Sequence, residues 1–210
     1  MKQKTTADLL YTKLKERLKK ELPGTLVHKE FSPLRKYQVD ETKYRESAVA
    51  IHLKFDLDNI ELILIKRSRY DGAHSQQIAF PGGKVELSDA NLEYTARRES
   101  NEEIGVPIEN GTCIGKLSPV LIPVSKFKVS PFIFVHKAFP ELIRNKREVD
   151  EIIQCRLSDI NSQTNKIYRD VEAKSGLILK NVPGINYKDH FIWGATALMI
   201  HELNCIIKTL

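Results

Sequence analysis

The sequence has few of the features that mark membrane, secreted or fibrous proteins. Its 210 residues contain no run that approaches the roughly 20 consecutive apolar residues of a membrane-spanning helix. Residues 1–4 (MKQK) lack the apolar core of a signal peptide. Cysteine is scarce, and Cys113, Cys155 and Cys205 are far apart, odd in number and without a paired metal-binding spacing. We therefore expect a cytoplasmic protein with reduced thiols and no membrane span.

Positive charge exceeds negative charge only slightly. The 33 basic and 27 acidic residues give a formal net charge of +6, too little to indicate nucleic-acid binding by itself. Hydrophobic residues make up 41% and charged residues 29%, as in ordinary folded domains. Residues 13–20 and 143–147 are basic, whereas residues 86–103 carry six acidic side chains against two basic ones. An acidic cluster in a basic chain requires a chemical explanation.

The chain divides into an extension and one domain. Residues 7–22 are expected to form a helix, because leucine recurs at every fourth position with charged residues between. We expect this helix to pack on the domain, with membrane-surface binding as the alternative. Residues 23–45 contain two prolines and many charges, which predicts an irregular arm. The N-terminal helix and arm thus span residues 1–45, and the domain spans residues 46–210.

Strand-like and helix-like patterns alternate through the domain. The β-rich runs are residues 48–55, 60–66, 113–122, 128–137 and 149–157. One helix is expected over residues 90–104, where Ser88 or Asp89 can cap the start and Gly105 ends it. A last helix is expected over residues 191–207. This order predicts an α/β or α+β domain with a mixed sheet.

The predicted acidic helix carries three carboxylates on one face. Glu99, Glu102 and Glu103 fall within an arc of about 100° at 3.6 residues per turn. Like charges at this spacing repel, and Arg98 can offset only one of them. A hard divalent cation favours carboxylate oxygens and would compensate the rest. A solvated charged face is the alternative, but the preceding turn at residues 80–83 (FPGG) lets the backbone approach a ligand.

This segment resembles the signature box of the Nudix hydrolases. That box reads Gly, five residues, Glu, seven residues, Arg-Glu, an apolar residue, any residue, Glu-Glu, any residue, Gly and an apolar residue. The matching positions here are Gly83, Asp89, Arg98, Glu99, Ser100, Glu102, Glu103, Gly105 and Val106. The chain departs from the box at three points: Asp89 replaces Glu, one extra residue precedes Arg98, and Ser100 replaces an apolar residue.

The extra residue is similar to the variant box of the coenzyme A pyrophosphatase branch of these enzymes. The shared positions are Phe80, Pro81, Gly82, Gly83, Lys84, Glu86, Thr95, Ala96, Arg98 and Glu99. Upstream, Arg67-Ser68 and residues 77–80 (QIAF) also resemble that branch, although Gln76 stands where the branch has glycine. Near the C-terminus, residues 193–197 (WGATA) are similar as well. The resemblance covers roughly residues 46–207.

The resemblance implies a Nudix fold, in which a mixed β-sheet is sandwiched between helices. It implies hydrolysis of a nucleoside diphosphate-linked substrate that depends on Mg²⁺ or Mn²⁺. The implied substrate is coenzyme A or acyl-CoA, cut to 3′,5′-ADP and (acyl) 4′-phosphopantetheine. Another nucleoside diphosphate, such as ADP-ribose or a dinucleotide, is the alternative, and a nucleotide-sensing module without hydrolysis is a third reading. We expect no nucleic-acid partner, and a monomer or homodimer.

The resemblance also implies roles for single residues. Glu99, Glu102 and Glu103 would be metal ligands, and Arg98 would orient Glu99 or Glu102 by a charge-assisted hydrogen bond. Asp89 would hold its loop by pairing with Arg98. Together with Arg98, Glu99 and Glu102 would form the catalytic set on the helix.

Other candidates lie outside the helix. Gly83 would offer backbone contact near the metal, and Arg67 and Lys84 would meet substrate phosphates. Glu148, just before a β-rich run, is the candidate base or extra ligand, with Glu151 as second choice. Residues three apart on a strand point to opposite faces, so only one of these two should face the site.

Overall fold

An eight-stranded mixed sheet and a three-stranded antiparallel sheet organise the protein in the computed structural model, which describes residues 5–33, 35, 40–56, 59–69, 74–172 and 176–210. The strands of the large sheet are β1 (Arg45–Asp56), β2 (Asn59–Arg67), β3 (Ile78–Ala79), β4 (Gly82–Lys84), β5 (Thr112–Lys116), β6 (Val120–Ile122), β7 (Phe127–His136) and β8 (Val149–Arg156). Strand β1 is central: it pairs parallel with β7 and antiparallel with β2 and β4.

The smaller sheet was not anticipated from the sequence as a unit. It contains β9 (Lys166–Glu172), β10 (Ile178–Tyr187) and β11 (His190–Trp193), in the order β11-β10-β9. Residues 191–193 therefore belong to a strand, and the last helix begins at Gly194 rather than at residue 191. Gly194 has φ of +64°, a left-handed conformation that permits the sharp change from strand to helix.

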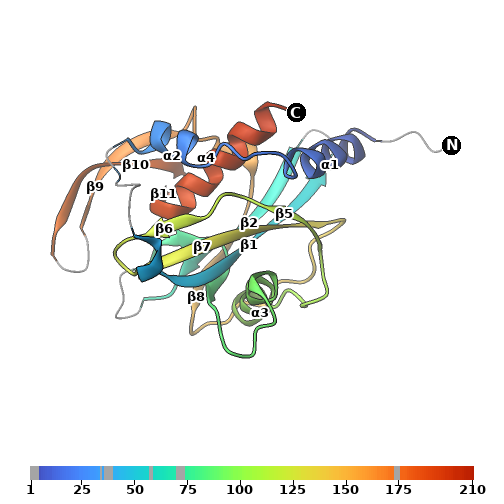
Figure 1. Ribbon diagram of the computed structural model, residues 1–210, viewed down its shortest axis with the longest axis horizontal. Coiled ribbons are helices and arrows are strands. Elements are labelled where there is room, and N and C mark those ends of the chain that lie inside the picture. Colours follow the sequence, from blue (N-terminus) through green and yellow to red (C-terminus); the bar gives the residue numbers. More distant parts are fainter. Residues whose placement is uncertain (1–4, 34, 36–39, 57–58, 70–73, 173–175) are drawn as a thin grey trace.

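Helices cover both faces of the large sheet (Figure 1). In the described residues the α-helices are α1 (Thr6–Arg17), α2 (Thr25–Phe31), α3 (Leu92–Ile104) and α4 (Gly194–Lys208), and short 3₁₀ turns span Glu41–Lys43 and Leu157–Ile160. Helices α1, α2 and α4 lie on one side of the sheet, and α3 lies on the other. This arrangement confirms the expected mixed sheet between helices with helices preceding the domain.

The N-terminal extension is part of the main core. Helix α1 ends at Arg17, earlier than expected, and the arm predicted to be irregular contains α2. Leu14 is 0% exposed and Phe31 is 2% exposed, and both pack in the same cluster as the buried face of α4. Burial of these apolar side chains, rather than helix propensity, stabilises such a short helix. Among the described residues, no helix is both long and apolar enough to cross a membrane.

A buried carboxylate anchors the extension. Glu202 on α4 is 0% exposed and accepts hydrogen bonds from Ser118 Oγ (2.7 Å) and from the Gly24 backbone N–H (3.3 Å). His28 Nε2 on α2 lies 3.1 Å from the same carboxylate. These hydrogen bonds hold the pKa of Glu202 below its ordinary value despite the burial. The arm, the β5–β6 connection and α4 thus meet at one ionised group.

The three cysteines are free thiols. Cys155 is buried, whereas Cys113 and Cys205 are half-buried. Burial raises the thiol pKa of Cys113 to about 11 and that of Cys155 to about 12. Both thiols are therefore protonated at neutral pH and are poor nucleophiles, as expected for packing residues.

Candidate active site

The glycine turn brings backbone against the acidic helix. Strand β4 pairs antiparallel with β1, with Gly82 opposite Val49 and Gly83 opposite Ala48. A Cβ atom on Gly82 would lie 2.3 Å from the carbonyl oxygen of Ala48, and one on Gly83 would lie 2.5 Å from the carboxylate of Glu99. Only glycine fits at Gly82, where backbone atoms block a side chain, whereas a side chain at Gly83 would displace the Glu99 carboxylate. The backbone of Gly83 therefore lies directly beside a predicted metal ligand.

Helix α3 begins later than the sequence suggested. Asn91, not Ser88 or Asp89, is the N-cap, and its side chain accepts a 2.9 Å hydrogen bond from the Tyr94 N–H. Gly105, with φ of +73°, ends the helix as predicted. Asp89 is available for another role because it does not cap the helix.

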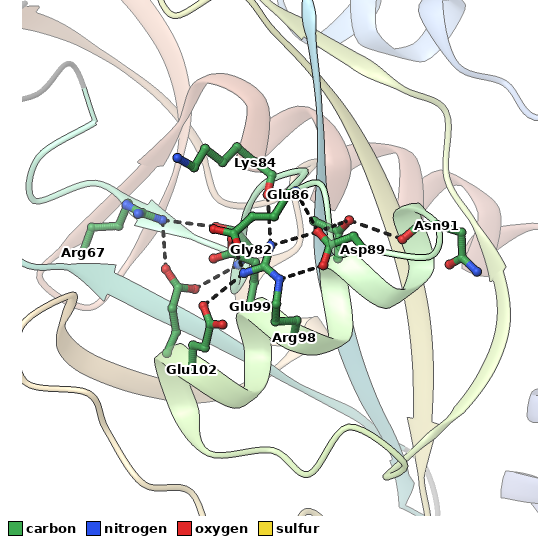
Figure 2. Close-up of polar contacts among 11 residues, drawn as sticks. Arg67, Gly82, Lys84, Glu86, Asp89, Asn91, Arg98, Glu99 and Glu102 are labelled. Atoms are coloured by element: carbon green, nitrogen blue, oxygen red, sulfur yellow. Dashed lines mark hydrogen bonds and ion pairs between the residues drawn. The ribbon is translucent and has the colours of Figure 1, made fainter.

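Arg98 is the centre of the site's hydrogen bonds (Figure 2). Its guanidinium donates to both oxygens of Asp89, at 2.8 and 3.0 Å. The resemblance had predicted this pairing. Arg98 also donates to Glu99 (3.0 Å) and Glu102 (3.1 Å), and to the Lys84 carbonyl (3.1 Å). The bidentate contact lowers the pKa of Asp89 to about 2. One cation thus ties the loop before the helix to two of the three carboxylates.

The three carboxylates differ in burial. Glu103 is 0% exposed and accepts a 2.9 Å hydrogen bond from the Gly82 N–H, whereas the Glu102 side chain is 48% exposed. Burial raises the pKa of Glu103 to about 7, and the charges of Glu99 and Glu148 add to the effect. Burial also raises the pKa of Glu99. Burial thus disfavours the ionised forms of Glu99 and Glu103, and the neighbouring arginines do not fully offset that effect.

The candidate residues outside the helix differ in exposure and in their contacts with the carboxylate cluster. Arg67 contacts Glu103 at 3.2 Å, so its guanidinium is engaged inside the acidic cluster. The Lys84 side chain is exposed. The charge of Glu148, an exposed residue, raises the pKa values of both Glu99 and Glu103, whereas Glu151 forms an ion pair with His190 at 3.5 Å.

A hard divalent cation suits this donor set. The candidate ligands are carboxylate oxygens of Glu99, Glu102 and Glu103, the donor type that Mg²⁺ and Mn²⁺ prefer. Burial raises the pKa values of Glu99 and Glu103, and a bound cation would favour the ionised forms that burial disfavours. Within the part of the chain that the structure describes, no three acidic, histidine or cysteine side chains form a ready metal cage. Arg98 and Arg67 hold the carboxylates instead.

Comparison with known proteins establishes the family. A family model described as the NUDIX domain matches residues 43–173, more than half of the chain. The chain belongs to the Nudix family. It is a Nudix pyrophosphohydrolase, and α3 is its Nudix helix.

Several Nudix relatives are similar over most of the domain. An uncharacterized Nudix hydrolase, NudL, from Pectobacterium atrosepticum is 35% identical over 142 residues, which cover 68% of this chain and 72% of that protein. The human mitochondrial coenzyme A diphosphatase NUDT8 is 30% identical over 139 residues, covering 66% of this chain and 58% of that protein. The crystal structure of a MutT/nudix family protein from Enterococcus faecalis aligns with 98% of this chain and 73% of its own, at 18% identity and a TM-score of 0.48.

Two segments outside the Nudix box gain a physical explanation from the structure. Thr196, in the C-terminal motif, donates a 3.0 Å hydrogen bond to the Ile78 carbonyl and so ties α4 to the strand that precedes the glycine turn. Gln76 has φ of +62°, a left-handed conformation that glycine adopts without strain. The backbone conformation at this position thus explains why the coenzyme A pyrophosphatase branch has glycine there. Gln76 adopts the same conformation at some cost in conformational energy.

A polar network that was not predicted from the sequence lies beneath the Nudix helix. Ser100 is buried and lies 3.0 Å from the buried ring of His52. The signal was present, because Ser100 stands where the box has an apolar residue. A buried hydroxyl requires a hydrogen-bond partner, but the sequence does not reveal which residue supplies it.

Proposed function

We propose that this Nudix enzyme hydrolyses the diphosphate of coenzyme A or acyl-CoA, giving 3′,5′-ADP and (acyl) 4′-phosphopantetheine, with Mg²⁺ or Mn²⁺. The observation that carries the proposal is the carboxylate cluster beside the glycine turn, in which Arg98 holds Glu99 and Glu102 while Arg67 and the Gly82 N–H hold Glu103. The coenzyme A assignment is supported by the name of NUDT8, a relative at 30% identity, and by Arg67-Ser68 and the QIAFPGGK run.

The roles of the acidic residues follow from their contacts. Glu103 is fixed by the Gly82 N–H and by Arg67, so it would be the pre-positioned ligand. Glu102 is exposed and pairs with Arg98 at the surface, so it is best able to turn toward an ion or substrate. When bound, the ion would polarise the diphosphate and lower the pKa of a water. Arg98 would orient Glu99 and Glu102 throughout.

The two candidate phosphate contacts, Arg67 and Lys84, differ in their surroundings. Arg67 contacts Glu103 through Nη1 alone, so its other N–H groups would meet a substrate phosphate from within the acidic cluster. Lys84 is exposed beside the turn and reaches phosphate without breaking a buried contact. We therefore propose Lys84 as the first phosphate contact and Arg67 as the second.

The base outside the helix is expected to be Glu148. Glu148→Gln should lower kcat at least about tenfold with little change in KM or thermal stability, because the residue is exposed and its charge reaches Glu99 and Glu103. Glu151→Gln is the matched control, since Glu151 also lies near the start of β8 but pairs with His190. Steady-state kinetics of both variants would give the ranking. The reverse ranking would transfer the role to Glu151.

A substrate panel tests the proposed function. Coenzyme A, dephospho-coenzyme A and ADP-ribose would be incubated with Mg²⁺, with Mn²⁺ and with excess EDTA, and products identified by mass. We expect kcat/KM for coenzyme A to exceed that for ADP-ribose by at least about tenfold, since each well-placed cation on the 3′-phosphate adds a charge-assisted contact. Full turnover in EDTA would refute the metal requirement.

Other results in the same panel would support the alternatives. A tenfold preference for ADP-ribose would favour hydrolysis of another nucleoside diphosphate, and Gln76 would then be the residue to examine first. Tight binding of a nucleotide without any product would favour a nucleotide-sensing role. That role is disfavoured by the sequence, since all three box carboxylates are present.

A further inference from the structure

A chain of polar side chains runs through the interior beneath the Nudix helix. Ser100 Oγ lies 3.0 Å from His52 Nε2, and His52 Nδ1 lies 2.8 Å from His136 Nε2. His136 Nδ1 in turn lies 3.1 Å from Asn110 Oδ1, in the connection after α3. The side chains of Ser100, His52 and His136 are at most 4% exposed. This row of hydrogen bonds therefore links α3 to β1, to β7 and to the loop that follows α3.

The surroundings are shaped to hold the two rings. Gly111 has φ of +79°, and a Cβ atom there would lie 2.6 Å from the His136 ring, so glycine makes room for the imidazole. The Arg97 guanidinium lies 4.4 Å from the centre of the Phe134 ring and donates to loop carbonyls. Burial lowers the pKa of His52 to about 3 and that of His136 to about 4, and smaller effects come from His136 and Arg97 on His52 and from Arg97 on His136. Both rings are neutral at pH 7.

Neutral rings give the chain a direction. Asn110 Oδ1 can only accept, so the proton of His136 is on Nδ1 and its Nε2 is an acceptor. The proton of His52 is then on Nδ1, which donates to His136, and its Nε2 accepts from the Ser100 hydroxyl. Every hydrogen bond in the chain is satisfied in only this order, given the orientation of Asn110.

The position of Ser100 connects this network to the acidic site. Ser100 follows Glu99 directly and precedes Glu103 by three residues, about one turn. An apolar contact at this position would tolerate sliding of the helix, whereas a hydrogen bond restricts both distance and angle. We propose that Ser100, His52, His136 and Asn110 are positioning residues, whose directional hydrogen-bond chain fixes the seating of α3 on β1 and β7 and with it the placement of Glu99 and Glu103 for the divalent ion.

A pair of matched variants separates positioning from stability. Ser100→Ala removes the hydroxyl at the head of the chain. Ser162→Ala removes a comparable buried hydroxyl that lies 2.8 Å from His201 Nδ1, and His201 belongs to α4, the helix on the other side of the sheet from α3. We expect similar losses of thermal stability in both. Only Ser100→Ala should raise the Mg²⁺ concentration for half-maximal hydrolysis, by about tenfold, with KM for the diphosphate nearly unchanged. Equal Mg²⁺ requirements in the two variants would overturn the proposal.

The direction of the chain has its own measurement. Imidazole ¹⁵N NMR of the full-length protein at pH 7 should show both rings neutral and protonated on Nδ1. In Ser100→Ala the resonance of His52 Nε2 should shift, because that nitrogen loses its donor. Protonation of either ring on Nε2 would mean that the chain runs the other way, and would overturn the assigned direction.

The activity readout rests on the proposed function, so a second readout is independent of it. Mn²⁺ binding to the protein without substrate, followed by electron paramagnetic resonance, should weaken about tenfold in Ser100→Ala and remain unchanged in Ser162→Ala. Absence of diphosphate hydrolysis together with this Mn²⁺ result would refute the proposed function and retain the positioning role. Equal Mn²⁺ affinities in wild type and Ser100→Ala would refute the positioning role whatever the enzyme hydrolyses.

Discussion

Glu102→Gln is expected to lower kcat at least about 100-fold without unfolding the protein. Electrostatic groups of an active site are commonly worth this much in transition-state stabilisation. The substitution removes one charge with almost no change in volume. The side chain is 48% exposed and its ion pair with Arg98, at 3.1 Å, lies at the surface, so little stability depends on it. Steady-state rates with coenzyme A and a thermal melt would be measured side by side.

The same helix offers a matched control for this result. Glu93 forms an equivalent ion pair with the arginine four residues later, Arg97, at 3.0 Å, and its side chain is 40% exposed. Glu93→Gln therefore removes the same charge from the same helix, in the first turn and outside the carboxylate cluster. We expect near-normal turnover in this variant. Near-normal turnover in Glu102→Gln as well would mean that the ion is bound elsewhere.

Glu202→Gln is expected to destabilise the protein by about 3 kcal/mol with kcat unchanged for the folded fraction. Removing a buried carboxylate that accepts several hydrogen bonds typically costs this much, because the remaining donors lose a charged acceptor. Here the affected donors are Ser118, Gly24 and His28. For a chain of this length, the midpoint of thermal unfolding should fall by roughly 6–12 °C.

The pH dependence distinguishes this mechanism from a simple packing defect. Since the pKa of Glu202 is lowered in the folded protein, its contribution is present above the ordinary carboxyl value of 4.5 and is lost as the pH falls below it. The difference in stability between wild type and Glu202→Gln should therefore narrow below pH 4.5. A difference independent of pH would contradict the ionised anchor. Glu16 forms an exposed ion pair with Lys19 on the surface near α1. Glu16→Gln should therefore leave the midpoint of thermal unfolding unchanged.

The positions of the box residues along the helix followed from local geometry. Glu99, Glu102 and Glu103 share a face because the helical repeat fixes their angular spacing. Gly105 ended the helix because a left-handed residue is needed there, and the FPGG turn predicted a close backbone approach that Gly83 makes to Glu99. These features depend on residues near in sequence, so the printed sequence suffices to predict them.

Other features depended on partners that are distant in sequence. Asn91 caps α3 because Asp89 is held by Arg98, and α2 forms because Phe31 is buried against α4. A local pattern contains no information about such competition between partners, and short helices and strands are stabilised mainly by tertiary packing. The sheet of β9, β10 and β11 was missed for the same reason.

The sequence by itself determined the family, the acidic helix and the set of candidate ligands, since these are written in residue types at fixed spacing. Only the tertiary structure decided which partner each polar side chain in and around the site contacts. Arg67 pairs with Glu103, Glu151 lies beside His190, and Ser100 lies beside the buried ring of His52. The physical reason is that a charge or hydroxyl is stabilised by whichever partner the fold brings within hydrogen-bonding distance, and that partner lies tens of residues away in the chain.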